Sequence, residues 1–135
     1  MHDGKAYESE TDGILVRVRP SYLAGQSDPE GGRWVWTYQV EIENRGAVSV
    51  QLMARHWTIT DGRGLTEEVR GPGVVGEQPT IQPGDSYSYA SGCPLGTASG
   101  AMSGGYQMVD DHGRMFEVEI PAFSLDVPGE RRVLN

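Results

Sequence analysis

The sequence predicts an all-β protein, an antiparallel β-sandwich of seven or eight short strands. Apolar residues recur at every second position through several segments, and turn residues separate these segments at intervals of roughly ten residues. The chain also contains 19 Gly and 8 Pro, two residue types that weaken helix interiors. No segment has a convincing helical pattern, so both observations favour strands joined by tight turns.

The first half of the chain contains the clearest strand patterns. Residues 14–19 alternate between an apolar face and a face that carries two arginines, and Pro20 is expected to end this strand. Residues 34–43 form the strongest pattern, because aromatic and branched side chains occupy every second position. After a short turn, residues 50–57 alternate again and predict a third strand.

The second half is expected to contain shorter strands. They are predicted at residues 65–70, 87–91, 105–109 and 115–120. Residues 110–113 read Asp-Asp-His-Gly, which is typical of a tight turn, and residues 121–127 extend the final strand past a proline. Residues 1–12 and the tail from Pro128 are polar and are predicted to be loose.

Length and charge restrict the domain organisation and the partners. The 135 residues predict one domain over positions 1–135, with an ordered core at 10–126. The net charge of −8 opposes binding to nucleic acids and anionic lipids, which need a basic surface. A basic protein surface matches better, and weak binding of divalent cations is expected. One cysteine, no signal-peptide pattern and no membrane-spanning apolar run predict a cytoplasmic protein.

Residues 71–76 read Gly-Pro-Gly-Val-Val-Gly, a G-x-G-x-x-G string. In dinucleotide-binding proteins this string opens a helix, whose N-terminal amides bind the pyrophosphate. The residues that follow here do not continue a helix. Two interpretations stay open: Gly71, Gly73 and Gly76 bind a phosphate through loop amides beside Arg70, or backbone geometry requires the glycines.

Patterns for metal binding and catalysis are weak. His56, His112 and Cys93 lack the spacing of zinc motifs, and no EF-hand sequence is present. A Cys93 nucleophile would need a histidine that is near only in the fold. For His56, a half-buried and hydrogen-bonded imidazole is favoured over a metal ligand. We therefore predict no metal site, no cofactor and no catalytic residues.

The third predicted strand offers a candidate partner surface. If Leu52 and His56 face the core, then Met53, Arg55 and Trp57 share the opposite face. Methionine, arginine and tryptophan are enriched at protein interfaces, so an outward row of these residues would suit a partner. The alternative is that Trp57 packs over the edge of the sandwich.

Several strings make the chain resemble the ApaG family. Residues 55–61 read R-H-W-T-I-T-D, residues 73–79 read G-V-V-G-E-Q-P, and further similar strings occur at 104–108 and 116–123. The resemblance covers positions 10–126. It implies a fibronectin type III-like β-sandwich, which agrees with the strand pattern.

The resemblance also implies a function. It implies a bacterial protein associated with cobalt resistance and magnesium efflux, and related domains in an F-box protein and a DNA polymerase delta-interacting protein look like protein-binding modules. We therefore predict a non-enzymatic module that binds an unidentified protein through the loops at 71–78 and 98–105, the second of which contains Met102, and influences cation handling indirectly. The alternative is a sensor of pyrophosphate or nucleotide polyphosphate at Arg70 and the glycine string. The oligomeric state stays open.

Overall fold

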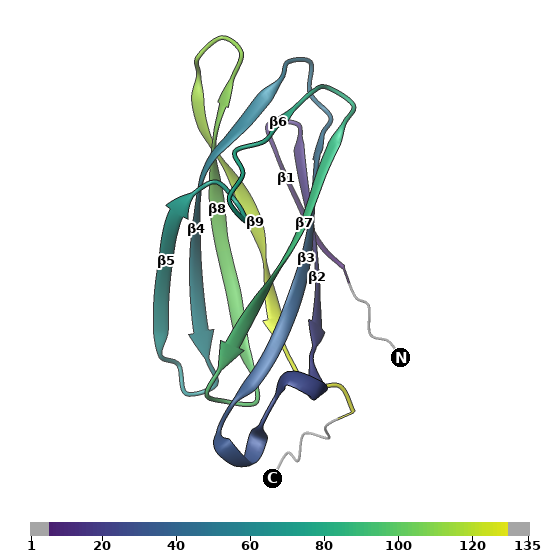
Figure 1. Ribbon diagram of the computed structural model, residues 1–135. Helices are drawn as coiled ribbons and strands as arrows, with labels where there is room; N and C mark the ends of the chain where they lie inside the picture. Colours follow the sequence, from purple (N-terminus) through teal and green to yellow (C-terminus); the bar gives the residue numbers. More distant parts are fainter. Residues whose placement is uncertain (1–5, 130–135) are drawn as a thin grey trace.

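The computed structural model describes residues 6–129, which form two antiparallel sheets packed face to face (Figure 1). The first sheet has the order β1 (Tyr7–Thr11), β2 (Ile14–Tyr22), β3 (Trp34–Asn44) and β7 (Ser86–Leu95). The second has the order β5 (Thr66–Pro72), β4 (Val50–Asp61), β8 (Gly100–Asp110) and β9 (Met115–Leu125), and β6 (Thr80–Ile81) also pairs with β4. The predicted β-sandwich is confirmed, with nine strands among the described residues.

Helical structure is confined to two short turns in the described part of the chain. They are the 3-10 turns Ala24–Gln26 and Pro29–Gly31, between β2 and β3. Within residues 6–129, no helix has the length and apolar character needed to cross a membrane.

The strands extend further than their patterns predicted. Residues 7–11, predicted to be loose, form β1, because Asp12 and Gly13 adopt positive φ values of 50° and 82° and turn the chain back onto β2. Pro20 does not end β2, which continues to Tyr22. Residues 1–5 and 130–135, which belong to the predicted loose ends, lie outside the described residues.

The core lies between the two sheets and is built around aromatic rings. Trp57 of β4 packs edge-on against Tyr38 of β3 and Phe123 of β9, with ring centroids 5.2 and 6.0 Å apart. Each such ring buries 150–250 Å², or about 4–6 kcal/mol of hydrophobic free energy at ~25 cal/mol per Å². The strong alternation at residues 34–43 is thus explained by one buried face of β3.

One polar side chain, Asn44, is buried among the described residues, with no exposed area. Its side-chain amide nitrogen donates to the carbonyl oxygens of Val48 and Ile81, both at 2.9 Å, and its amide oxygen accepts from the Gly46 N–H at 2.9 Å. Asn44 therefore joins the end of β3 to the β3–β4 turn and to β6.

We predict that Asn44→Ala destabilises the fold by about 2–4 kcal/mol, because one buried and two partly buried backbone groups lose their partner. Urea unfolding followed by tryptophan fluorescence measures the change. Gln39→Ala is the matched control, since Gln39 is an exposed amide side chain on the same strand. Equal stability of the two variants would contradict this role of Asn44.

Candidate functional site

A β-bulge at Met53 decides which residues of β4 face the core. Leu52 pairs with Met108 but Ala54 pairs with Gln107, so Met53 is an extra residue in β4. The extra residue reverses the alternation, and the side chains that follow it point the opposite way to the prediction.

The bulge shows that the predicted outward row is wrong. Trp57 is 3% exposed and packs in the core, while Met53 and Arg55 are half-buried. Met102 belongs to β8 rather than to a loop and is 2% exposed. His56 lies on the outer face of its sheet as a half-buried, hydrogen-bonded imidazole, 3.2 Å from the carboxylate of Glu68.

The glycine string supplies hydrogen-bond partners for the backbone at this bulge. The carbonyl oxygen of Met53 accepts hydrogen bonds from the Gly73 N–H and from the Gln78 side-chain amide, both at 2.9 Å. In return, Arg55 donates from Nη1 to the carbonyl oxygens of Pro72 and Gly73, at 3.1 and 2.9 Å. The loop and the bulge therefore hold each other in place.

Each glycine of the string has a structural reason, which is a side-chain contact at Gly71 and backbone geometry at Gly73 and Gly76. The Arg55 guanidinium lies over Gly71, where a Cβ would stand 3.1 Å from its nitrogens. Gly73 has a φ of 58°, and a Cβ there would stand 2.1 Å from the carbonyl oxygen of Glu77. Gly76, with a φ of 82°, forms a two-residue turn with Val75, whose φ is 42°. Positive φ at both central positions is typical of a type I′ hairpin turn.

Backbone N–H groups and the arginine that could bind a phosphate at the glycine string already have partners within the chain. The Gly73 N–H bonds to Met53, while the Val74 and Glu77 N–H groups bond to each other's carbonyl oxygens at 2.8 and 2.9 Å. Arg70 donates to the Glu68 carboxylate at 3.2 Å. Hydrogen bonds from His56 and then from Arg70 lower the pKa of Glu68. The structure therefore favours the architectural interpretation of the glycines.

The loops at 71–78 and 98–105 do not form one contact surface. Pro72 pairs with Ala54 of β4, whereas Gly100 pairs with Asp61. Seven positions of β4 separate these partners, which corresponds to about 23 Å along a strand. Most of the second segment is also strand, because β8 begins at Gly100.

A cleft of about 310 Å³ opens between β5 and β7, on one side of the sandwich. We call it the side cleft. It is lined by Tyr38, Arg55, Trp57, Ile59, Glu67, Val69, Ser91, Gly92, Cys93, Pro94 and Met102. Its walls combine apolar side chains with polar groups in similar shares, and a guanidinium, a phenol and a carboxylate are among the polar ones.

The surroundings of the Cys93 thiol in the side cleft do not favour its reactive thiolate form. Burial, followed by the nearby Glu67 carboxylate, raises the pKa of Cys93 to about 11, so the thiol is protonated at neutral pH. His56 lies on the outer face of its sheet, and the exposed His112 lies in the β8–β9 turn beside Asp111. Among residues 6–129, no three His, Cys, Asp or Glu side chains form a group that could hold a metal ion.

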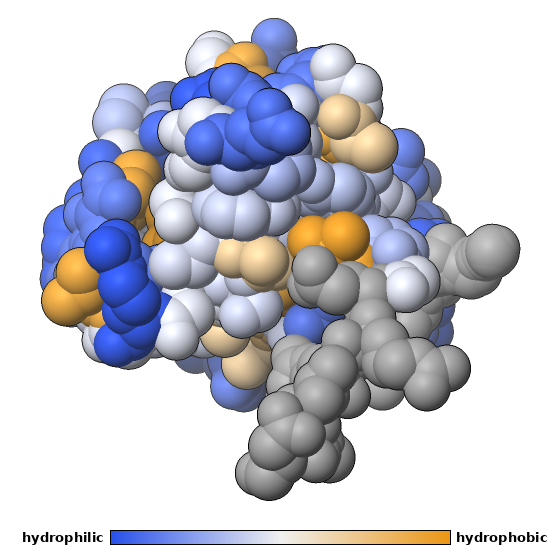
Figure 2. Space-filling model, turned by 90° about the horizontal axis from the view of Figure 1, so that it is seen from below, coloured by the Kyte–Doolittle hydropathy of each residue, from blue (hydrophilic) through white to orange (hydrophobic). Residues whose placement is uncertain are grey.

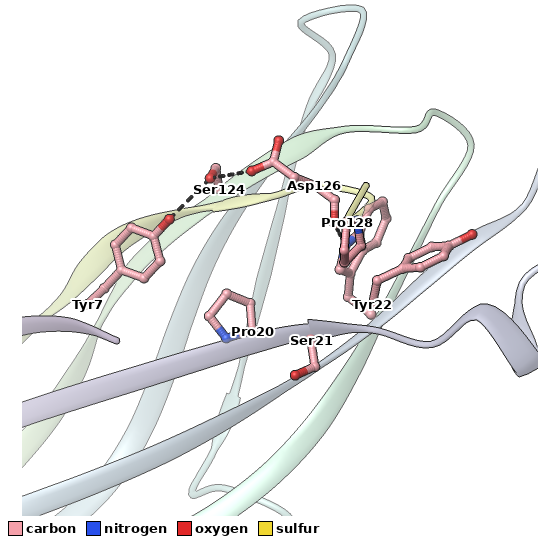
Figure 3. Close-up of a pocket in the computed structure, with 8 residues that line it drawn as sticks. Tyr7, Pro20, Ser21, Tyr22, Ser124, Asp126 and Pro128 are labelled. Atoms are coloured by element: carbon pink, nitrogen blue, oxygen red, sulfur yellow. Dashed lines mark hydrogen bonds between the residues drawn. The ribbon is translucent and has the colours of Figure 1, made fainter. Parts of the chain in front are cut away.

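The opposite side of the sandwich, between β1 and β9, is closed by hydrogen bonds. The Tyr7 hydroxyl lies 3.2 Å from Ser124 Oγ, which donates to Asp126, as Figure 3 shows. The Thr11 hydroxyl accepts from the Glu119 N–H at 3.2 Å. A hollow of about 320 Å³ remains beside these contacts and is lined by rings of tyrosine, tryptophan and proline.

The end of the sandwich seen in Figure 2 offers no large apolar surface. Hydrophilic residues cover most of it, and apolar residues appear as separate small areas. Leu65, in the β4–β5 turn, is one of the exposed apolar residues of the chain, at 63%. This end of the sandwich is therefore a weaker candidate for recognition than the side cleft.

The fold and this site define a β-sandwich domain with one closed and one open side. The profile of the ApaG domain matches residues 24–110, and the chain belongs to the ApaG family. Protein ApaG of Brucella anthropi is 59% identical over 129 residues, covering 96% of this chain and 99% of that protein. Protein ApaG of Mesorhizobium japonicum is 57% identical over the same shares. Neither name specifies a catalytic activity.

A solved structure supports the same assignment. The crystal structure of a Bordetella pertussis protein described as ApaA superposes with a TM-score of 0.85 at 46% identity. The match covers 87% of this chain and 95% of that chain. The family resemblance predicted from the sequence is therefore confirmed.

We predict that Gly73→Ala destabilises the protein by about 3–5 kcal/mol, because a methyl group meets the Glu77 carbonyl and the backbone needs a positive φ. Gly76→Ala is the matched control: it shares the positive φ but faces open space, so about 1–2 kcal/mol is expected. Urea unfolding measures both. A loss at Gly73 no larger than that at Gly76 would refute the close-approach argument.

We also predict that millimolar pyrophosphate causes no saturable amide shifts at residues 70–76, because three of the local amides already donate within the chain. A titration followed by NMR of the isotope-labelled protein tests this. Saturable shifts with a dissociation constant below about 100 μM, lost in Arg70→Ala, would instead establish the sensor alternative.

Proposed function

We propose that this chain is a non-enzymatic binding module of the cytoplasm that captures a partner protein at the side cleft. Its influence on cobalt resistance and magnesium efflux is then indirect and is exerted through that partner. Since a soluble sandwich has no path for ions, the partner rather than this domain moves the cation.

The unequal closure of the two sides of the sandwich carries this proposal. Side-chain hydrogen bonds join β1 to β9, whereas β5 and β7 flank an open cleft lined by both apolar and polar side chains. Recognition sites are concave, mostly apolar and supplied with a small number of placed polar groups. The side cleft is concave and sets apolar side chains, Trp57, Val69 and Met102 among them, beside placed polar groups such as Arg55 and Glu67.

The chemistry of the side cleft favours binding over catalysis. A nucleophile needs an adjacent base, but of the histidines in residues 6–129, His56 lies on the outer face of the other sheet and His112 in the β8–β9 turn, away from the protonated Cys93 thiol. Arg55 donates hydrogen bonds to the carbonyl oxygens of Pro72 and Gly73 and so stabilises the glycine loop. The pyrophosphate sensor remains the second candidate, supported by the composition of that loop and by the neighbouring Arg70.

Charge reversal within and outside the side cleft tests this proposal. Glu67→Arg changes an exposed carboxylate that lines the cleft, and Glu117→Arg makes the same change on the exposed side of β9. Each immobilised variant is used to capture proteins from bacterial lysate, followed by mass spectrometry. We predict that Glu67→Arg loses a partner at least tenfold relative to Glu117→Arg, as expected for about 1.4 kcal/mol or more at an interface. Equal capture by both variants would remove the side cleft from consideration.

A further inference from the structure

We propose that the partner binds as an extended segment that adds to the free edge of β7, as a fifth strand of the first sheet. An apolar side chain of that segment enters the side cleft, and a basic side chain near it faces Glu67. This inference rests on the proposed function and specifies how the side cleft recognises its partner.

The edge of β7 is built for strand addition. In the part of the chain that the structure describes, β7 pairs with β3 alone, so its other edge has no strand beside it. Its ten residues, S-Y-S-Y-A-S-G-C-P-L, include no charged side chain. Proteins usually protect such edges with charged residues, bulges or short strands, because unpaired backbone groups recruit another strand. Only Pro94, near the end of β7, interrupts the donors.

The two sheets leave a place for this strand. β5 forms the left margin of the molecule in Figure 1, and β7 does not extend across it. Trp57 on the inner face of β4 is buried, whereas Val69 on the inner face of β5 is half-buried and Glu67 is exposed. A strand added beside β7 would cover the inner face of β5 and complete the sandwich.

The side cleft then selects the side chains of the added strand. Side chains alternate between the two faces of a sheet, so every second residue of the segment points into the space between the sheets. An apolar side chain at such a position would contact Trp57, Val69 and Met102, which line the cleft. The outer face of β7 carries small residues, Ser88, Ala90 and Gly92 among them, and places little restriction on the other positions.

The charges at the side cleft favour a basic segment. The Glu67 carboxylate lines the cleft and forms no ion pair within residues 6–129. The Glu77 carboxylate lies close enough to Tyr87 of β7 to add to the effect of burial, which raises the pKa of that hydroxyl. A lysine or arginine two residues from the inserted apolar side chain lies on the same face of the segment and would meet Glu67.

A second copy of this chain fits the site less well. Pairing of two β7 edges would bring a second Glu67 and a second Glu77 to the same region, between two proteins of net charge −8. Like charges placed opposite each other suppress a wrong partner. The occupant is therefore a segment of a different protein with alternating basic and apolar residues.

The first experiment selects peptides on the full chain. A display library of nine-residue peptides, with Thr at even positions and random residues at odd positions, is panned on the immobilised protein. We expect enrichment of peptides with a large apolar residue flanked two positions away by Lys or Arg. A library that yields no enriched peptide, or one dominated by Asp and Glu, would overturn the proposal.

Hydrogen–deuterium exchange then locates the enriched peptide. We expect every second amide of residues 86–93, those that point to the free edge, to be protected at least tenfold on binding, because the other amides already donate to β3. Binding without protection of β7 would overturn strand addition. Protection of the same amides in concentrated protein alone, with a dimer in sedimentation, would assign the edge to a second copy and also overturn the proposal.

Two neighbouring glutamates provide the matched variants. Glu67 lines the side cleft, while the next residue, Glu68, bonds to His56 and Arg70 on the outer face. We expect Glu67→Gln to weaken binding of the enriched peptide at least threefold and Glu68→Gln to leave its binding unchanged. Equal effects would remove the basic contact.

The lysate and peptide experiments separate the two levels of the proposal. If Glu67→Arg no longer captures the cellular partner but the peptide does not protect the β7 amides from exchange, the binding function is retained and strand addition is rejected. Capture that is insensitive to Glu67→Arg would reject the side cleft as the site of partner capture, whatever the peptides do.

Discussion

The extra residue at Met53 is the constraint on which the rest of this structure depends. Without it, β4 would present His56 to the core and Trp57 to solvent. With it, Arg55 and Trp57 turn inward, the aromatic cluster forms, and the guanidinium reaches the carbonyls of Pro72 and Gly73 at the end of β5. A bulge leaves a backbone group without a ladder partner, and here the glycine loop supplies that partner at Met53.

The glycine string accordingly acts as a structural clamp. A nucleotide-binding string works because a helix follows and directs unbonded amides at an anion. Here the string itself ends in a type I′ turn at Val75 and Gly76, and its amides bond inside the chain. The same residue string therefore has a different role here than in nucleotide-binding proteins, because the backbone around it has a different conformation. Val74, which has no exposed area, anchors this clamp in the core.

Period-two alternation predicted the fold class and most strands, since one face of β3 is buried along its whole length. It could not locate the bulge, because alternation on either side of Met53 is compatible with both faces, and only pairing with β8 decides between them. It also missed β1, where Asp12 and Gly13 form a turn inside a polar segment. The side cleft depends on contacts between β5 and β7, which no local pattern contains.

The pairing of β7 has a consequence for how the chain folds. Glu43 pairs with Ser86 and Trp34 pairs with Leu95, so β7 reaches β3 only after the intervening chain has closed a long loop. Closure of such a loop is entropically costly and delays the contact relative to local hairpins. Until then an uncharged, tyrosine-containing strand has both edges unpaired, a state in which chains associate wrongly. The composition of β7 therefore exposes the newly made protein to aggregation during its synthesis.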